Sequence, residues 1–309
     1  MKDANSHIRN GIGTVRPFIY GRLSPRNECG RVELPKMSQR IDRSEGRRLF
    51  GLNPEGYDHA RPEYPAAIYR FLVDQRALVP NTATLEIGAG SGLATRRLIE
   101  LGANPITVIE PDIRFSPSLR ALGEATGTDI RWIQTAFENA ELPPHAFDLV
   151  AAATSFHLLD PEVALDKIAD ALKPGGFAAL WWNVFQGLDR EDPFHDATRS
   201  LLADLATSPS GAPGTTPFAL DRRTREADLA RTDKFEAVAY AETRWTLMLD
   251  AEQVGRLYEG FSHIQRLPEA ERVQLLRTLI EIARNQFGGR VERNMTSVIY
   301  LARRKQLEK

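Results

Sequence analysis

A regular alternation of strand and helix signals between residues 64 and 182 constrains the fold of this 309-residue chain more than any other feature. Helical patterns separate apolar runs that are typical of strands, at 83–87, 106–110, 130–134, 147–152 and 177–182. Such an alternation forms a mostly parallel sheet with helices on both of its faces. Two later strand-like segments, 235–245 and 297–303, are expected to pair as an antiparallel edge. The sequence therefore predicts an α/β, Rossmann-like sheet of seven strands.

The two ends of the chain differ from this repeating middle. Residues 1–48 carry eleven Lys and Arg against five Asp and Glu and show no helical or strand period. We expect them to be a basic N-terminal extension, either flexible or a lid, and residues 49–309 to form the functional domain. Helices expected at about 192–207 and 250–287 would cap this domain.

Charge and composition exclude several classes of function. Lys plus Arg number 40 and Asp plus Glu 41, which argues against a nucleic-acid partner. No apolar run reaches the length of a membrane span, and the N-terminus lacks the apolar stretch of a secretory signal. We therefore expect a cytoplasmic protein that binds no membrane. Whether it forms a homo-oligomer is left open by the sequence. The single Cys and six scattered His predict no metal site.

The strongest motif is a glycine turn at the end of the first strand, where a helix begins. Its backbone amides and the helix N-terminus favour a ligand that approaches closely. A dinucleotide site would need Gly or Ala at position 93, where this chain has Leu93. Glu86 would repel a pyrophosphate but attract an ammonium group. The motif therefore favours S-adenosylmethionine over NAD, bound by Glu86, Gly88, Ala89, Gly90 and Gly92.

Further cofactor residues are expected where the other strands end, because ligands bind at the carboxyl ends of such strands. Glu110 ends the second strand, 24 positions after Glu86, and an acid at this place accepts hydrogen bonds from ribose hydroxyls. The neighbouring residues Pro111, Ala136, Phe137 and Thr154 are assigned to the same site.

The acceptor is expected to lie against aromatic side chains. Phe156 and Phe185 follow the fourth and fifth strands, and Tyr258 and Phe261 lie on one stripe of a late helix. These four residues predict a small, partly apolar acceptor. His157 is the candidate general base, but a structural role is favoured, because a carboxylate acceptor needs no base.

Four segments resemble the class I S-adenosylmethionine-dependent methyltransferases, within the branch of trans-aconitate methyltransferase and the ubiquinone-biosynthesis enzymes. They are residues 57–65, 85–92, 147–150 and 172–176. The resemblance implies that Tyr57 and Arg61 close over the cofactor and that Phe137 lies near its adenine. One departure is Leu158, where many relatives have an aromatic residue, so the acceptor pocket is expected to differ in shape.

The expected function is methyl transfer from S-adenosylmethionine to a small molecule. The transfer is an O- or C-methylation, with a carboxylate or a hydroxyl as the acceptor group. Two alternatives stay open, an RNA-modifying methyltransferase and a non-catalytic protein that binds S-adenosylmethionine.

Overall fold

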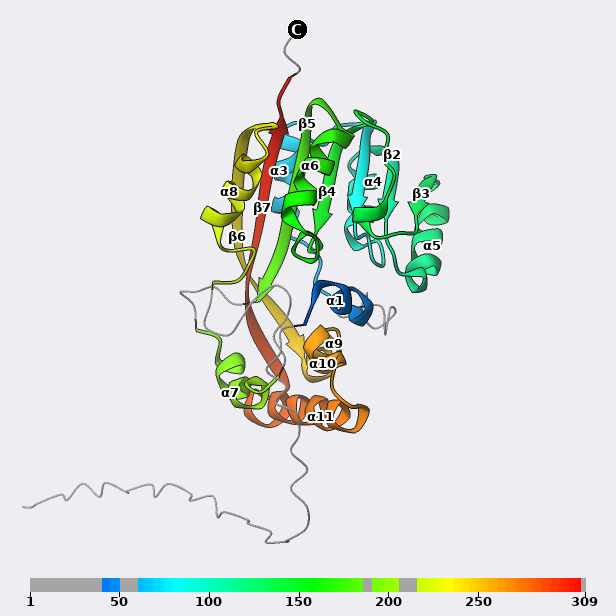
Figure 1. Ribbon diagram of the computed structural model, residues 1–309. Helices are drawn as coiled ribbons and strands as arrows, with labels where there is room; N and C mark the ends of the chain where they lie inside the picture. The colour runs from blue at the N-terminus through cyan, green and yellow to red at the C-terminus, as the bar shows by residue number, and fades with distance from the viewer. Residues whose placement is uncertain (1–40, 51–60, 186–190, 206–215, 307–309) are drawn as a thin grey trace, which may run out of the picture. The chain divides into compact units, whose positions relative to one another are not determined.

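A seven-stranded sheet with the order β3-β2-β1-β4-β5-β7-β6 organises the computed structural model of the chain (Figure 1). The structure describes residues 41–50, 61–185, 191–205 and 216–306, all within one compact unit, Lys36–Lys309. The strands are β1 (Thr82–Ile87), β2 (Ala103–Ile109), β3 (Ile130–Ile133), β4 (Phe147–Ala153), β5 (Leu172–Phe185), β6 (Phe235–Asp250) and β7 (Arg290–Arg304).

The direction of the strands confirms the predicted fold class. β1 pairs in parallel with β2 and β4, and the outer pairs β2–β3 and β4–β5 are parallel as well. β7 runs antiparallel to both of its neighbours, β5 and β6. Parallel neighbours need a crossover, and the helices between the first five strands provide it.

Helices cover both faces of the sheet. One face packs against α3 (Ala66–Asp74), α4 (Leu93–Glu100) and α5 (Ser116–Thr126), and the other against α6 (Pro161–Ala171) and α8 (Arg222–Arg231). Short 3-10 turns follow β2, β3 and β4: η1 (Ile113–Phe115), η2 (Phe137–Asn139) and η3 (Phe156–Leu158). The carboxyl ends of β1, β2 and β4 are thereby left open to a ligand, as expected for this fold.

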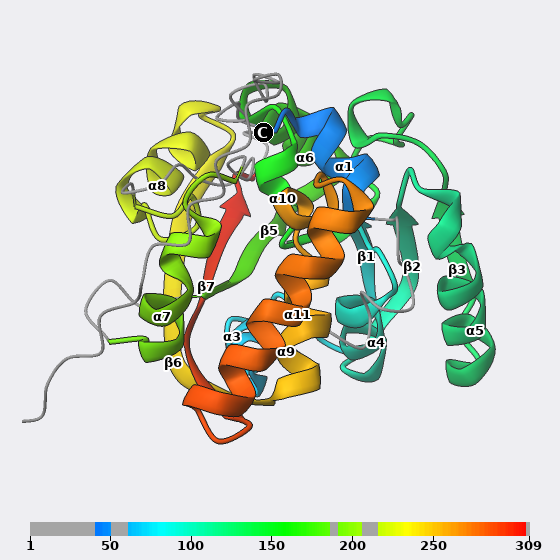
Figure 2. The same cartoon turned by 90° about the horizontal axis from the view of Figure 1, so that it is seen from below.

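A helical cap lies beyond the carboxyl ends of the parallel strands, nearest the viewer in Figure 2. It consists of α7 (Pro193–Leu202), α9 (Ala251–Glu259), α10 (Ser262–Gln265) and α11 (Glu269–Gln286). β6 and β7 are longer than expected because their antiparallel pairing continues as far as Asp250 and Arg290. In the sequence, the helices α9 to α11 lie between these two residues. Asp250 also begins α9, where its carboxylate and Gln253 form a capping box.

Part of the expected N-terminal extension belongs to this unit. α1 (Arg43–Phe50) is a helix, and Ile41 before it is only 1% exposed. The boundary that we expect at residue 48 therefore falls inside a helix, because the period of so short a helix is hidden among its many arginines. Residues 1–40 lie outside the described part of the chain.

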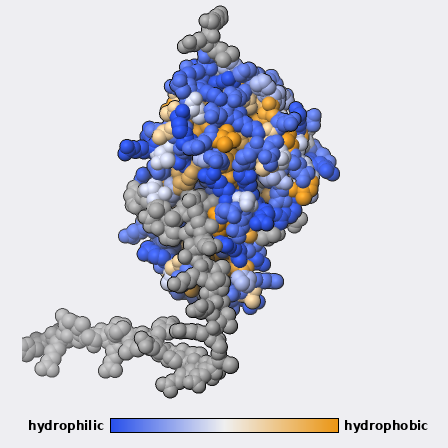
Figure 3. Space-filling view, viewed as in Figure 1, coloured by the Kyte–Doolittle hydropathy of each residue, from blue (hydrophilic) through white to orange (hydrophobic). Residues whose placement is uncertain are grey.

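Large apolar side chains gather in the interior of the molecule. Two buried clusters lie on the two faces of the sheet, and a third lies within the cap. The face of the molecule seen in Figure 3 is mainly hydrophilic, with hydrophobic residues scattered over it. None of the helices in the described part has the length and hydropathy that a membrane crossing requires.

Candidate active site

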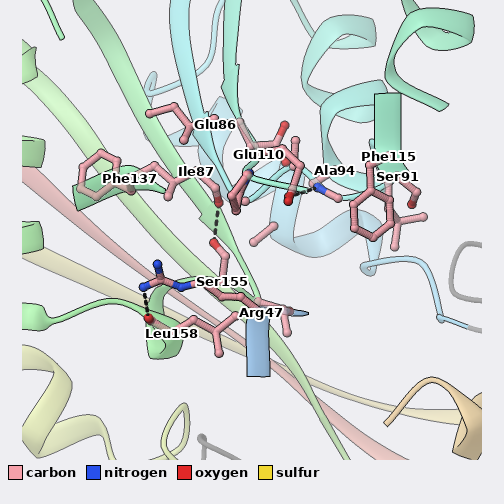
Figure 4. A pocket seen from close by; sticks show the side chains of 18 of the residues that line it. Arg47, Glu86, Ile87, Ser91, Ala94, Glu110, Phe115, Phe137, Ser155 and Leu158 are labelled. Carbon is pink, nitrogen blue, oxygen red and sulfur yellow. Dashed lines mark hydrogen bonds between the residues drawn. The ribbon is translucent and has the colours of Figure 1, made fainter. Parts of the chain in front are cut away.

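A pocket opens at the carboxyl ends of β1, β2 and β4, and we call it the glycine-turn pocket (Figure 4). Most of the residues assigned to the cofactor from the sequence line it. These are Glu86, Gly88, Ala89, Gly90, Glu110, Pro111, Ala136, Phe137 and Thr154. They come together because the ends of neighbouring parallel strands meet at one edge of the sheet.

The glycine turn leaves room for a ligand where side chains would block it. Gly88 has a φ of +72° and Gly90 a φ of +54°, a backbone region that favours glycine. A Cβ on Gly88 would lie 2.7 Å from the Cβ of Ser155, whereas Gly90 faces open space. Gly92 does not line the pocket: it is the N-cap of α4, packed so closely that a Cβ would lie 2.9 Å from Leu122.

Glu86 is the buried acid of this pocket, with 1% of its surface exposed. Thr95 Oγ1 donates a hydrogen bond to Glu86 Oε2 at 2.6 Å, while Oε1 has no hydrogen-bond partner among the described residues. Burial raises the pKa of Glu86 to about 8. A buried carboxyl with an unsatisfied oxygen fits the ammonium group of S-adenosylmethionine, whose charge would replace the lost hydration.

Glu110 connects the glycine turn to the segment after β2. Its Oε2 accepts a hydrogen bond from the backbone N–H of Gly90 at 2.9 Å, and its Oε1 accepts one from Asp112 N–H at 3.0 Å. Burial raises the pKa of Glu110, against the effect of these two donors. The carboxylate therefore orients the turn, and its remaining lone pairs suit ribose hydroxyls.

Two residues that the sequence interpretation missed also line this pocket. Arg47 extends from α1, and its Nη2 donates to Glu138 Oε1 at 2.6 Å. The same nitrogen donates to the Leu158 carbonyl at 2.6 Å (Figure 4). Tyr64 shares a hydrogen bond of 2.8 Å with the hydroxyl of Thr154. No local pattern marks Arg47, but Tyr64 lies in the 57–65 segment that carries the resemblance.

A second pocket of about 360 Å³, which we call the acceptor pocket, lies between the end of β5 and the cap. Phe185, Tyr258 and Phe261 line it, as assigned from the sequence, together with Trp182 and Phe218. Phe261 packs edge-on against Phe185 and Tyr258, with ring centroids 5.5 and 5.3 Å apart. Such an aromatic enclosure suits a small molecule with a flat or apolar body.

His157 lines the acceptor pocket as a neutral imidazole. Trp182 Nε1 donates a hydrogen bond to its Nδ1 at 3.2 Å, which leaves the ring proton on Nε2. Burial, followed by the charge of Arg61, lowers the pKa of His157 to about 3. A base with so low a pKa accepts protons poorly near neutral pH, so a structural role for His157 stays the prediction.

Two other assigned residues lie away from their expected places, and a third cannot be compared. Phe156 is fully buried in the core of the sheet and lines neither pocket, because η3 turns its ring inward. Arg61 lines the acceptor pocket, not the glycine-turn pocket, and its guanidinium lies 5.3 Å from the centre of the Phe261 ring. Tyr57 falls outside the described residues.

A buried ion pair braces the acceptor pocket, and the sequence interpretation missed it as well. Arg293 Nε donates to Asp192 Oδ2 at 2.8 Å, and its Nη1 donates to the Tyr258 hydroxyl at 2.9 Å. Arg293 lies on β7, Asp192 precedes α7 and Tyr258 lies on α9. The ion pair therefore fixes the cap to the sheet beside the pocket. Asp192 and Arg293 are too far apart in the sequence to form a recognisable motif.

Comparisons with known proteins point to methyltransferases. Residues 85–180 match a family model described as a methyltransferase domain. An uncharacterized methyltransferase of Schizosaccharomyces pombe is 29% identical over 82% of this chain and 96% of its own length. An uncharacterized methyltransferase of Mycobacterium bovis is 32% identical over 44% of this chain and 52% of its own.

Solved structures share the fold. The crystal structure of the YcgJ protein from Bacillus subtilis superimposes with a TM-score of 0.51 at 15% identity, over 79% of this chain and 100% of that one. The matched residues 85–180 contain the strand ends, the glycine turn and both buried acids of the glycine-turn pocket. The chain is therefore an S-adenosylmethionine-dependent methyltransferase.

Proposed function

We propose that the enzyme methylates a carboxylate oxygen of a small, partly apolar acid held in the acceptor pocket. The observation that carries this proposal is the set of ionisable groups around that pocket. It contains Arg61 and three histidines, and no Asp or Glu is among the described residues that line it, while Arg293, which also lines it, is already paired with Asp192. The pocket therefore favours an acceptor that brings its own negative charge.

The pocket offers no strong base for an acceptor that would have to lose a proton. Burial and the charge of Arg61 lower the pKa of His263 to about 4 as well as that of His157 to about 3. The pKa of His195 is also lowered, by burial and then by the charge of Arg293. A hydroxyl or carbon acid needs a base with a pKa near the working pH, whereas a carboxylate needs none. These three groups therefore favour a carboxylate over a hydroxyl.

The protein's part in the reaction is to align the two reactants. When bound, S-adenosylmethionine supplies a methyl group whose bond to sulfur breaks, leaving its electron pair on sulfur as an acceptor oxygen forms the new bond. Glu86 and the glycine turn, which line the same pocket, would hold its methionine end, and Glu110 would hold its ribose. Arg61 attracts the acceptor's carboxylate, and the rings of Phe185 and Phe261 exclude water from it. No proton has to move, because the product is a neutral ester.

The direct test is methyl transfer from labelled S-adenosylmethionine to a panel of aromatic and aliphatic acids, with the matching alcohols as a comparison. We expect acids to be methylated, with a base-labile ester as the product. Arg61→Gln should raise the KM of the acid about tenfold or more, through the loss of a charge-assisted contact, with unchanged affinity for S-adenosylhomocysteine. Arg256→Gln is the matched control, because Arg256 is exposed on α9 and lines neither pocket.

Other outcomes separate the alternatives. Methylation of RNA with no acid accepted would contradict the proposal and support the RNA-modifying alternative. Binding of S-adenosylhomocysteine with no transfer to any acceptor would support a non-catalytic role. Methylation of the alcohols in preference to the acids would show that a base has been overlooked.

A further inference from the structure

One residue is shared by the walls of the two pockets. Thr154 lines both the glycine-turn pocket and the acceptor pocket, and no other residue in the described part of the chain does so. It directly follows the last residue of β4, with a backbone φ of +52°. A β-branched residue is a rare outlier in this left-handed region, so its surroundings must hold it there.

Three hydrogen bonds hold this turn in place. The backbone N–H of Thr154 donates to the carbonyl of Trp181 at 2.8 Å. The next residue, Ser155, donates from its hydroxyl to the carbonyl of Ile87 at 2.5 Å (Figure 4). The third bond joins the hydroxyls of Thr154 and Tyr64, 2.8 Å apart. The Thr154 oxygen is therefore fixed where the pockets meet.

Tyr64 is itself held by aromatic neighbours. Its ring packs edge-on against Trp181 at 6.0 Å and against Tyr69 at 6.5 Å between centroids. Both neighbours are almost completely buried, so the Tyr64 ring has little freedom to turn away. The two hydroxyl oxygens thus form a preorganised pair on the wall of the glycine-turn pocket.

This place has a defined chemical role in an in-line transfer. The methyl group has to lie between the sulfur in one pocket and the acceptor in the other, and a sulfonium gives its methyl hydrogens partial positive charge. Oxygens attract such C–H groups. We propose that the hydroxyl oxygens of Tyr64 and Thr154 contact the sulfonium methyl group and direct it towards the acceptor pocket. The proposal rests on the assignment of the donor to the glycine-turn pocket, and it makes both residues positioning residues.

Two ligands that differ by this methyl group and by the positive charge that it gives to sulfur provide a test that needs no acceptor. Tyr64→Phe and Thr154→Val each remove one hydroxyl and keep the shape of the side chain. Calorimetry should show S-adenosylmethionine binding weakened about three- to fivefold in each variant, and S-adenosylhomocysteine binding unchanged within about twofold. Thr154→Ser keeps the hydroxyl and should keep the wild-type ratio of the two affinities. The double variant should lose little more than either single one, because the hydroxyls act as a pair.

Tyr69→Phe is the matched control. It also removes a buried tyrosine hydroxyl beside Tyr64, but this hydroxyl has no hydrogen-bond partner among the described residues, and Tyr69 lines neither pocket. The ratio of affinities should therefore stay unchanged, and thermal unfolding checks that each variant is folded. Equal weakening of both ligands would overturn the proposal, because it would make the pair structural only. Unchanged binding of both ligands would overturn it too. A wild-type chain that binds neither ligand would instead contradict the donor assignment.

Discussion

At the scale of single residues, the protonation of Glu86 depends on what occupies the glycine-turn pocket. Burial raises its pKa to about 8, so in the ligand-free protein the carboxyl is largely protonated at pH 7. An ammonium group beside the unsatisfied Oε1 would favour the carboxylate. Binding of S-adenosylhomocysteine near pH 7 should therefore release a proton from Glu86, which calorimetry in two buffers of different ionisation enthalpy measures.

The control for this prediction is Glu86→Gln, which keeps the shape of the side chain but cannot ionise. Its binding should be weaker and should release fewer protons than the wild-type binding, with a difference of up to one. Any proton exchanged by the ligand's own amino group is common to both proteins and cancels in the comparison. Identical proton release by the two proteins would remove Glu86 from the contact with the ligand.

At the scale of elements, α1 connects the walls of the two pockets. Its Arg47 lines the glycine-turn pocket and binds Glu138 and the Leu158 carbonyl, while its Glu45 lies 3.2 Å from Arg266, which follows α10. Arg47→Ala should weaken the binding of S-adenosylhomocysteine by about 1–2 kcal/mol, because α1 is then held less firmly over the ligand. Calorimetry measures the change in affinity, and thermal unfolding measures the small expected loss of stability.

Two further variants make the test of α1 specific. Glu138→Gln removes the charge that orients Arg47, so it should reproduce part of the loss. Arg48→Ala is the control, because the Arg48 side chain is exposed. The hydrogen bond from Arg114 goes to the backbone carbonyl of Arg48, so the substitution keeps it. An equal loss of affinity in Arg48→Ala would mean that the positive charge of α1 matters and that the hydrogen bonds of Arg47 to Glu138 and Leu158 do not.

At the scale of the whole molecule, buried histidines and a buried glutamate change the free energy of unfolding with pH in opposite directions. His157 and His263 have pKa values of about 3 and about 4, below the value of 6.5 for an ordinary His. Unfolded chains therefore bind more protons than the folded protein between about pH 4 and 6.5, and stability rises with pH there. The pKa of Glu86 is raised from 4.5 to about 8. Between these two pH values the folded protein binds more protons than the unfolded chain at this group, so this contribution to stability falls as pH rises.

Above about pH 7.5 the two histidines are neutral in the unfolded chain as well, so their contribution is complete and only the Glu86 contribution still changes. The free energy of unfolding of the ligand-free protein should then fall towards pH 8, by up to about 1.4 kcal/mol per pH unit. Urea unfolding of the wild type and of Glu86→Gln at about pH 6.5 and about pH 8 measures the difference, because other groups are common to both. Parallel behaviour of the two proteins would show that Glu86 is ionised in the ligand-free state.

The sequence by itself determined the sheet and most of the glycine-turn pocket. Strand and helix periods are local properties, and the direction of each crossover follows from them. Once the strands are parallel, their carboxyl ends meet, so Glu86, Glu110, Phe137 and Thr154 had to lie near one another. The glycine turn was equally legible, because Gly88 and Gly90 serve a backbone conformation that other residues adopt rarely.

The tertiary structure alone decided which side chains from distant segments complete the site. Arg47 meets Glu138 over 91 positions of sequence, Tyr64 meets Thr154 over 90, and Asp192 meets Arg293 over 101. It also decided that Phe156 faces the core and that α1 belongs to the pocket wall. Local periodicity predicts which face of an element is apolar, but it carries no information on which distant element covers that face, since the packing of the whole chain selects those contacts.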